Sequence, residues 1–383
     1  MGADVRHAAL TAVLAMTAGV LAACGGSAPA ANLVSVSNGG CGGRWHLASP
    51  GWHTFAVYNA AAEAVTVDLV NPADGAIYAE VETIGPQTTS PLSLDVGSGS
   101  YAFRCLFDEY DPITGPTVVV GGHASGSPAI LPVTSDDLLG PARQYHAYVA
   151  AGLNTLVSQT DAVAADVRGG NLSAARTGWL TAHLTYERLG AAYDAFGTFD
   201  DEIDGRPDGL AGGLTSPKWT GFYRLEYGLW HGQSGHELTS VADTLAADVR
   251  ALRTSWPSTE INLLDLGLRT HEILENALEF QLSGHDDYGS GSTLATTAAN
   301  VTGTLELLTV LHPLLAVRYS GLPAAYRWLD RLTTLLNHNK RPNGLGVPVS
   351  GLSQRSRAQI DAACGQALEE LAPIAAITEP RIS

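Results

Sequence analysis

Apolar and polar residues alternate with a period of two along the first part of the chain, from residue 33 to about residue 122. Such alternation is typical of strands that bury one face. Turn signals such as Asn-Pro, Asp-Gly and Gly-Ser separate the alternating runs. The predicted strands are residues 54–58, 65–70, 77–81, 92–96, 101–105 and 116–120. Short strands at this spacing predict a β-sandwich over residues 33–122.

The period changes to 3.6 residues after a stretch rich in glycine, serine and proline. We interpret residues 123–133 as a linker between two domains. The pattern over residues 134–383 predicts about eight helices with short connections, which is typical of an all-α bundle. The sequence therefore predicts a multi-domain α and β protein, with the sandwich first and the bundle second.

The N-terminus predicts an extracytoplasmic location. The apolar run from Ala8 to Ala22 is too short to span a membrane but suits the core of a signal peptide. It ends in Leu-Ala-Ala-Cys24, which resembles the bacterial lipobox. We expect residues 1–23 to be a lipoprotein signal peptide and residues 24–32 to be a flexible tether. Lipid on Cys24 would anchor the protein to the cell membrane.

The overall charge limits the kinds of partner. The formal net charge is −17, which argues against nucleic acid and anionic lipid as partners. The same charge suits a protein that binds cations, although solubility alone also explains an acidic composition.

The remaining cysteines allow two interpretations. In an oxidising compartment Cys41 and Cys105 are a natural disulfide pair, and Cys364 stays unpaired. Cys105 also ends a strand as the copper thiolate of a cupredoxin does. However, no histidine follows it before His123, and no methionine follows it at all. We favour the disulfide and keep copper as the alternative.

Two helical segments place an imidazole and a carboxylate on one face. His183 and Glu187 are four residues apart, and His271 and Glu275 repeat this spacing. The second segment begins like the zinc-protease motif His-Glu-x-x-His but has Glu275 where the second histidine belongs. The sequence therefore does not indicate a metallopeptidase. A helical histidine is also more often structural than a metal ligand.

An acidic loop and an aromatic segment lie between these two helices. Residues 200–208 hold five acids but have Ala211 where an EF-hand needs its last glutamate, so we reject an EF-hand. Residues 219–231 combine five aromatic side chains with Glu226. Carboxylates with little imidazole and no thiolate suit hard cations, and iron is the best single interpretation. Surface ion pairs and core packing are the plainer alternatives.

These segments together resemble the imelysin-like family and, within it, the EfeO type, which has a cupredoxin-like domain ahead of an imelysin domain. The resemblance implies an iron-binding, membrane-anchored component of an uptake system, without enzymatic activity. It implies Fe³⁺ or Fe²⁺ as the bound ion, with other divalent metals possible. The implied partners are a membrane iron permease and a haem peroxidase of the same system. The matching segments are residues 182–193, 203–207, 221–232 and 271–281.

The same resemblance implies a set of metal ligands. The family motif Gly-Phe-His-x-x-Glu has Tyr223 in place of its histidine. Either the protein favours ferric iron through a phenolate or the site is weakened. An imelysin-type metallopeptidase and a degenerate lipoprotein that binds no metal are therefore the alternatives. The expected ligands are Glu187, Asp204, Tyr223, Glu226, Glu272 and Glu275, with Glu272 and Glu275 not separable and His183 and His271 as secondary candidates.

Overall fold

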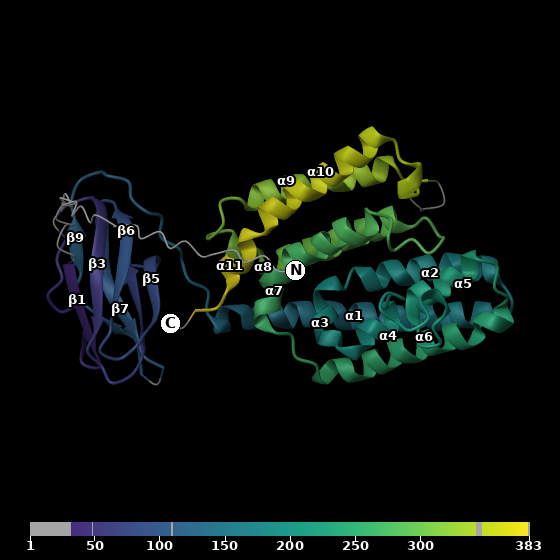
Figure 1. The fold of residues 1–383 in the computed structure, drawn as a ribbon, viewed down its shortest axis with the longest axis horizontal. Coiled ribbons are helices and arrows are strands. Elements are labelled where there is room, and N and C mark those ends of the chain that lie inside the picture. The colour runs from purple at the N-terminus through teal and green to yellow at the C-terminus, as the bar shows by residue number, and fades with distance from the viewer. Residues whose placement is uncertain (1–31, 48, 109, 342–346, 382–383) are drawn as a thin grey trace, which may run out of the picture.

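The structure, a computed structural model, describes residues 32–381 apart from residues 48, 109 and 342–346. Figure 1 shows a β part and a helical part side by side along the long axis of the molecule. This arrangement confirms the predicted fold class, with strands first and helices after them. The predicted signal peptide, the lipidated Cys24 and the tether up to residue 31 lie outside the described residues.

Two sheets pack against each other in the β part and share one core. One sheet has the order β2-β1-β3-β6, and the other has the order β5-β4-β7-β8 with β9 also paired to β7. Strands β1 and β3 are parallel, and the other pairs are antiparallel. The strands are β1 (Asn32–Ser37), β2 (Gly40–Cys41), β3 (Gly51–Asn59), β4 (Val65–Val70), β5 (Ile77–Ile84), β6 (Thr89–Val96), β7 (Gly99–Leu106), β8 (Ile113–Thr114) and β9 (Val118–Val120).

The sandwich core is aromatic and is crossed by a disulfide. The rings of Trp45, Phe55 and Phe103 meet edge to face, with centroids 4.9 to 6.0 Å apart. Cys41 of β2 and Cys105 of β7 form a disulfide bond, which joins the two sheets. The bond links residues with a sequence separation of 64. Closing a loop of this length removes chain entropy from the unfolded state, which contributes about 4 kcal/mol to stability.

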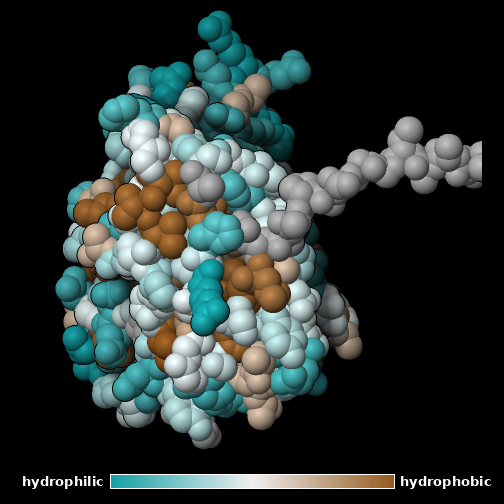
Figure 2. Space-filling model, turned by 90° about the vertical axis from the view of Figure 1, so that its left-hand side faces the viewer, coloured by the Kyte–Doolittle hydropathy of each residue, from teal (hydrophilic) through white to brown (hydrophobic). Residues whose placement is uncertain are grey.

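The outer surface of the sandwich carries isolated apolar side chains. Leu33, Trp52 and Val119 are 66%, 72% and 70% exposed. Figure 2 shows apolar patches on this end of the molecule, with polar surface between them. Scattered exposed apolar side chains are normal on a protein surface, so they define no site by themselves.

The helical part consists of long core helices and short connecting helices. Its first helix begins at a capping box, in which Thr134 and Asp137 satisfy each other's backbone amides. The α-helices are α1 (Ser135–Arg168), α2 (Leu172–Glu187), α3 (Tyr193–Phe196), α4 (Thr198–Asp204), α5 (Gly221–Trp230), α6 (Gly235–Ser255), α7 (Leu263–Asn276), α8 (Thr293–Leu315), α9 (Leu322–His338), α10 (Gln354–Leu371) and α11 (Pro373–Thr378). The short elements are η1 (Gly190–Ala192), η2 (Gly213–Thr215), η3 (Trp256–Ser258), η5 (Val349–Gly351) and a π-helix, η4 (Ala277–Gln281).

One continuous apolar core holds the helices together. Tyr145 of α1, Trp179 of α2 and Val249 of α6 are fully buried in it. Among the described residues, α8 is the one helix long and apolar enough to cross a membrane. Within the most apolar 18-residue stretch of α8, 67% is buried inside the protein. We therefore interpret α8 as a core helix.

The predicted linker is tied to both parts of the molecule. Ile130 forms a β-bridge with β5. The guanidinium of Arg318, just after α8, donates to the carbonyl oxygens of residues 131 and 132 at 3.0 and 2.9 Å. Arg381, near the C-terminus, forms an ion pair with β5. Residues 123–133 therefore connect the two parts without being a free chain.

Candidate metal centre

Helix α2 carries two residues of the candidate site. His183 and Glu187 lie one turn apart on its buried face and are 1% and 3% exposed. Trp179, one turn earlier, stacks on the imidazole with ring centroids 5.0 Å apart. The Nε2 atom of His183 lies 2.9 Å from Oε1 of Glu187. The spacing of one turn thus directs an imidazole and a carboxylate into the interior.

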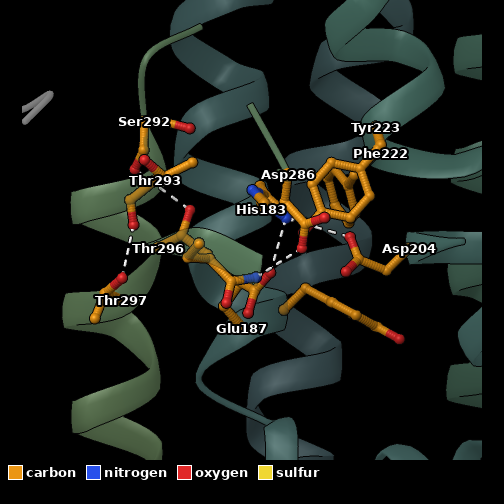
Figure 3. A network of polar contacts seen from close by, with 12 residues as sticks. His183, Glu187, Asp204, Phe222, Tyr223, Asp286, Ser292, Thr293, Thr296 and Thr297 are labelled. Atoms are coloured by element: carbon orange, nitrogen blue, oxygen red, sulfur yellow. Dashed lines mark hydrogen bonds and ion pairs between the residues drawn. The ribbon is translucent and has the colours of Figure 1, made fainter. Parts of the chain in front are cut away.

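Helix α4 brings a third residue to this pair. Asp204 ends α4, and its Oδ1 lies 3.2 Å from His183 Nε2. Gly221, which starts α5, packs on the end of α4 with a φ of +83°, and a Cβ there would lie 2.2 Å from the Ile203 carbonyl oxygen. Only glycine permits this approach. The ligand atoms of His183, Glu187 and Asp204 lie within 4.8 Å of one another (Figure 3).

The three converging atoms contact one another as ion pairs but form no aligned hydrogen bond. His183 Nε2, Glu187 Oε1 and Asp204 Oδ1 are buried, and none has a correctly aligned hydrogen-bond partner among the described residues. Buried polar atoms in proteins are nearly always paired, so such a group requires an explanation. One imidazole nitrogen and two carboxylate oxygens around a common point are a donor set for iron, manganese or zinc. The residues present therefore fit a metal ion.

The electrostatics of the site favour a cation. Burial raises the pKa of Asp204, and the Glu187 charge adds to this shift. Burial lowers the pKa of His183, but the neighbouring carboxylates of Asp204 and Glu187 raise it by more than burial lowers it. The net shift of this pKa is therefore upward. Asp200 and Glu226 also have pKa values raised by burial, to about 6 and about 7. Buried negative charge is thus undercompensated here, and a bound cation would supply the compensation.

Helix α5 places Tyr223 and Glu226 beside the three residues but not among them. The ring of Tyr223 stands edge-on to His183, with centroids 5.3 Å apart. Its hydroxyl donates to Asp286 Oδ2 at 3.3 Å, and burial raises its pKa well above the ordinary value. Glu226 accepts a hydrogen bond from the Ser290 amide at 2.9 Å. The structure therefore gives both residues protein partners of their own.

The acids of α7 do not reach the site. Glu272 forms an ion pair with Arg269 at 3.1 Å, and Glu275 is exposed. His271 does not join the three residues either. The four-residue spacing predicted that one face carries His271 and Glu275, but it did not predict which way that face points. Helix α7 turns its apolar face to the core, so these residues lie on its other sides.

Further polar residues surround a cavity of about 160 Å³ next to the three residues. The π-helix η4 ends at Gln281 and directs this buried side chain into the cavity. π-helices are frequent at functional sites. The cavity wall includes Glu187, Asp200, Asp204, Tyr223 and also Tyr193, Asp194, Arg206, Arg269, Gln281 and Asn300, the last six of which the sequence did not single out.

Comparison with known proteins identifies the family. The sequence profile of the family Imelysin matches residues 141–372, from α1 to the end of α10. The chain belongs to the imelysin family. This membership confirms the predicted resemblance to imelysin-like proteins of the EfeO type. The cupredoxin-like character of the sandwich, which the profile does not cover, stays a prediction.

Relatives within the imelysin family carry a functional name. "Iron uptake system component EfeO" of Yersinia pestis is 29% identical over 241 residues, covering 62% of this chain and 62% of the relative. The protein of the same name from Escherichia coli CFT073 is 28% identical over 247 residues, with the same coverage of 62% on each side. The chain thus covers 62% of the length of these relatives.

Proposed function

We propose that this protein is an extracytoplasmic, membrane-anchored iron-binding component of an uptake system. One observation carries the proposal: three buried ligand atoms, on His183, Glu187 and Asp204, converge without hydrogen bonds. The names of the relatives in Yersinia pestis and Escherichia coli support iron as the ion and uptake as the process. The lipobox-like sequence ending at Cys24 supports the membrane anchor.

Each of the three residues has a distinct part in holding the ion. His183 supplies a neutral imidazole nitrogen, so its proton leaves when the ion binds. Glu187 and Asp204 supply carboxylate oxygens, whose charge the ion neutralises. Two carboxylates and one imidazole leave further coordination positions open for exchange with a donor or acceptor of iron. A membrane iron permease and a haem peroxidase of the same system are the proposed partners.

The surroundings of the site suit the capture of a cation from solution. Asp200, Asp204 and Arg206 line both the inner cavity and an outer depression of about 500 Å³. Asp201, Glu202 and Asp208 add further acids to this outer depression. Five acids against Arg206 and Lys218 leave this depression net negative, and a negative depression concentrates cations and raises their association rate. We expect iron to enter through this acidic opening.

A metal titration tests the proposal. Purified protein should bind one equivalent of Fe²⁺ under anaerobic conditions, or of Fe³⁺ delivered from a weak chelator, in calorimetry. His183→Ala and Glu187→Gln should weaken binding at least about 100-fold, more than the loss typical of residues that only support the ligands. Glu275→Gln, on the exposed side of α7, is the matched control and should bind like the wild type.

Three results would overturn the proposal. Wild-type protein that binds no metal would favour a degenerate lipoprotein. Metal binding that persists in His183→Ala would place the site elsewhere. Cleavage of a protein substrate by the metal-loaded wild type, lost in Glu187→Gln, would instead favour a metallopeptidase.

A further inference from the structure

A buried aspartate beside the candidate metal centre has two oxygens in different surroundings. Asp286 lies between η4 and α8 and is 3% exposed. Its Oδ2 accepts hydrogen bonds from the Tyr223 hydroxyl at 3.3 Å and from Gln281 Nε2 at 3.0 Å. Its Oδ1 has no hydrogen-bond partner among the described residues. Arg206 Nε is 3.4 Å from Oδ1, but the two are not aligned as a hydrogen bond.

This carboxylate is fixed in orientation by its neighbours. Two donors from different elements, α5 and η4, hold Oδ2 in place. With one oxygen held, the direction of the other is set as well. Supporting residues orient metal ligands in this way, and their loss usually costs 10- to 100-fold in metal affinity. The free Oδ1 is therefore held in a fixed position without a ligand of its own.

The free oxygen belongs to the surroundings of the three converging residues. Figure 3 shows the Asp286 carboxylate close to His183 and Glu187. Its two hydrogen-bond donors, Tyr223 and Gln281, line the same cavity as Glu187 and Asp204. Asp286 is nevertheless absent from the group of atoms that lie within 4.8 Å of one another. Asp286 would thus lie outside the direct ligands of an ion held by those atoms.

A buried carboxylate oxygen without a partner is costly. A buried charge without compensation reduces the stability of the fold. Arg206 offsets part of this cost, but it is 34% exposed and is also engaged over the ring of Phe280 at 3.6 Å. A cation in the adjacent centre would offset the rest, because it attracts the carboxylate across one water molecule.

Resting on the function proposed above, we propose that Asp286 is an outer carboxylate of the metal centre and that Tyr223 positions it instead of ligating the ion. Asp286 faces the ion across a bound water through Oδ1. Tyr223 stays a neutral phenol that donates to Oδ2. With neutral His183, the carboxylates of Glu187, Asp204 and Asp286 carry three negative charges, of which Arg206 offsets part at Asp286, and the attraction of each carboxylate grows with the charge of the ion. The centre therefore prefers trivalent over divalent ions.

The test compares two metals and two variants. Ga³⁺ serves as a trivalent probe without redox chemistry, and Mn²⁺ serves as the divalent probe. Asp286→Asn keeps an oxygen for the two donors and removes the charge, so it should weaken Ga³⁺ about 10- to 100-fold and Mn²⁺ clearly less. Tyr223→Phe should weaken Ga³⁺ by a smaller factor. Glu275→Gln is the charge-matched control and should change neither affinity.

A spectroscopic measurement tests the part of Tyr223 directly. The Fe³⁺-loaded wild type should show no visible phenolate-to-iron band. Such a band in wild type, lost in Tyr223→Phe, would make Tyr223 a ligand and overturn the proposal. Circular dichroism should show native helix content in each variant.

The outcomes separate this proposal from the proposed function. If Asp286→Asn binds both metals like wild type while His183→Ala loses them, the centre is real and the part of Asp286 is wrong. An equal loss of Ga³⁺ and Mn²⁺ in Asp286→Asn would reject the preference for trivalent ions. Wild type that binds neither probe would overturn both proposals.

Discussion

The substitution Asp204→Asn should raise the stability of the metal-free protein and remove the gain that metal gives. Asp204 is mostly enclosed, with a side chain that is 13% exposed, and burial raises its pKa. A carboxyl whose pKa is higher in the folded state contributes stability below its unfolded pKa, near ~3.9, and this contribution is lost as the pH rises through the folded value. An amide has the shape of the protonated acid but never ionises. The variant therefore avoids this loss.

The size of the stability gain follows from the thermodynamic linkage between the pKa shift of a group and the free energy of unfolding. Each unit by which the folded pKa exceeds the unfolded one is worth about 1.4 kcal/mol once the pH lies above it. Burial raises the pKa of Asp204 to about 8, so only part of this loss has occurred at neutral pH, and the variant should be more stable than wild type there by at least about 1.4 kcal/mol. For a domain of this size that is a gain of roughly 3 to 6 °C in Tm. The difference should disappear near pH 4, where both proteins are uncharged at this position.

Metal should reverse the order of stability, so that wild type becomes more stable than Asp204→Asn. At a metal concentration of 100 Kd, binding adds about 2.7 kcal/mol to the free energy of unfolding of wild type. Asp204→Asn loses a charged ligand and should gain little. Thermal denaturation followed by circular dichroism, with chelator and then with metal, measures both effects, and Glu275→Gln is the control. A variant that melts below wild type in chelator at neutral pH would refute the reasoning, since Asp204 would then be a stabilising partner of His183.

Two further predictions concern the sandwich and its connection to the helices. Denatured, unreduced protein should be alkylated only at Cys364, provided Cys24 is acylated or replaced, and reduction should expose two more thiols; three reactive thiols before reduction would exclude the Cys41–Cys105 bond. Arg318→Ala removes charged hydrogen bonds worth about 1.5–3 kcal/mol each, so proteases should cut the linker several-fold faster than in wild type and release a helical fragment from near residue 134. A fragment that unfolds on release would show that the two parts share one core.

The sequence predicted the fold well because most elements have a clear hydrophobic period. The predicted strand at residues 65–70 has the same bounds as β4, and the other predicted strands overlap observed ones. Strands β1, β2 and β8 were missed. β2 and β8 have only two residues each, too few for a period to appear. β1 pairs parallel to β3. Parallel strands are not joined by a tight hairpin turn, so no turn residues mark this pairing in the sequence.

The candidate metal centre was predictable only in part, because helical spacing does not give the direction of a face. His183 and Glu187 share their spacing with His271 and Glu275, yet only the first pair points inward. Trp179 stacking on His183 and the packing of the neighbouring helices decide this, and neither is visible in the spacing. The resemblance placed the imidazole of the motif at position 223, where this chain has tyrosine, while His183 lies at the centre.

Asp286 gave no signal at all in the sequence. It lies in an irregular segment between η4 and α8, where no period applies. The π-helix before it closes i→i+5 hydrogen bonds in place of the i→i+4 bonds of an α-helix, which shifts the phase of its side chains. Gln281 at the end of this π-helix donates to Asp286. Long-range contacts of this kind require the tertiary structure.

Carboxylate oxygens in this part of the helical bundle differ in whether they accept a hydrogen bond, and the difference argues for function. Asp200 accepts a hydrogen bond from the Tyr186 hydroxyl at 2.6 Å, and Glu226 accepts one from the Ser290 amide at 2.9 Å. These acids are satisfied by the protein itself. Glu187 Oε1, Asp204 Oδ1 and Asp286 Oδ1 have no such partner among the described residues.

Folding alone does not favour the clustering of carboxylate oxygens that have ion-pair contacts but no aligned hydrogen bond. The chain nevertheless places a hydrogen-bond donor beside Asp200 and beside Glu226. A fold that can satisfy Asp200 and Glu226 could satisfy the remaining acids in the same way. That it leaves their oxygens free around one imidazole is explained if a cation is the missing partner, and the stability lost in the metal-free state is then recovered on binding.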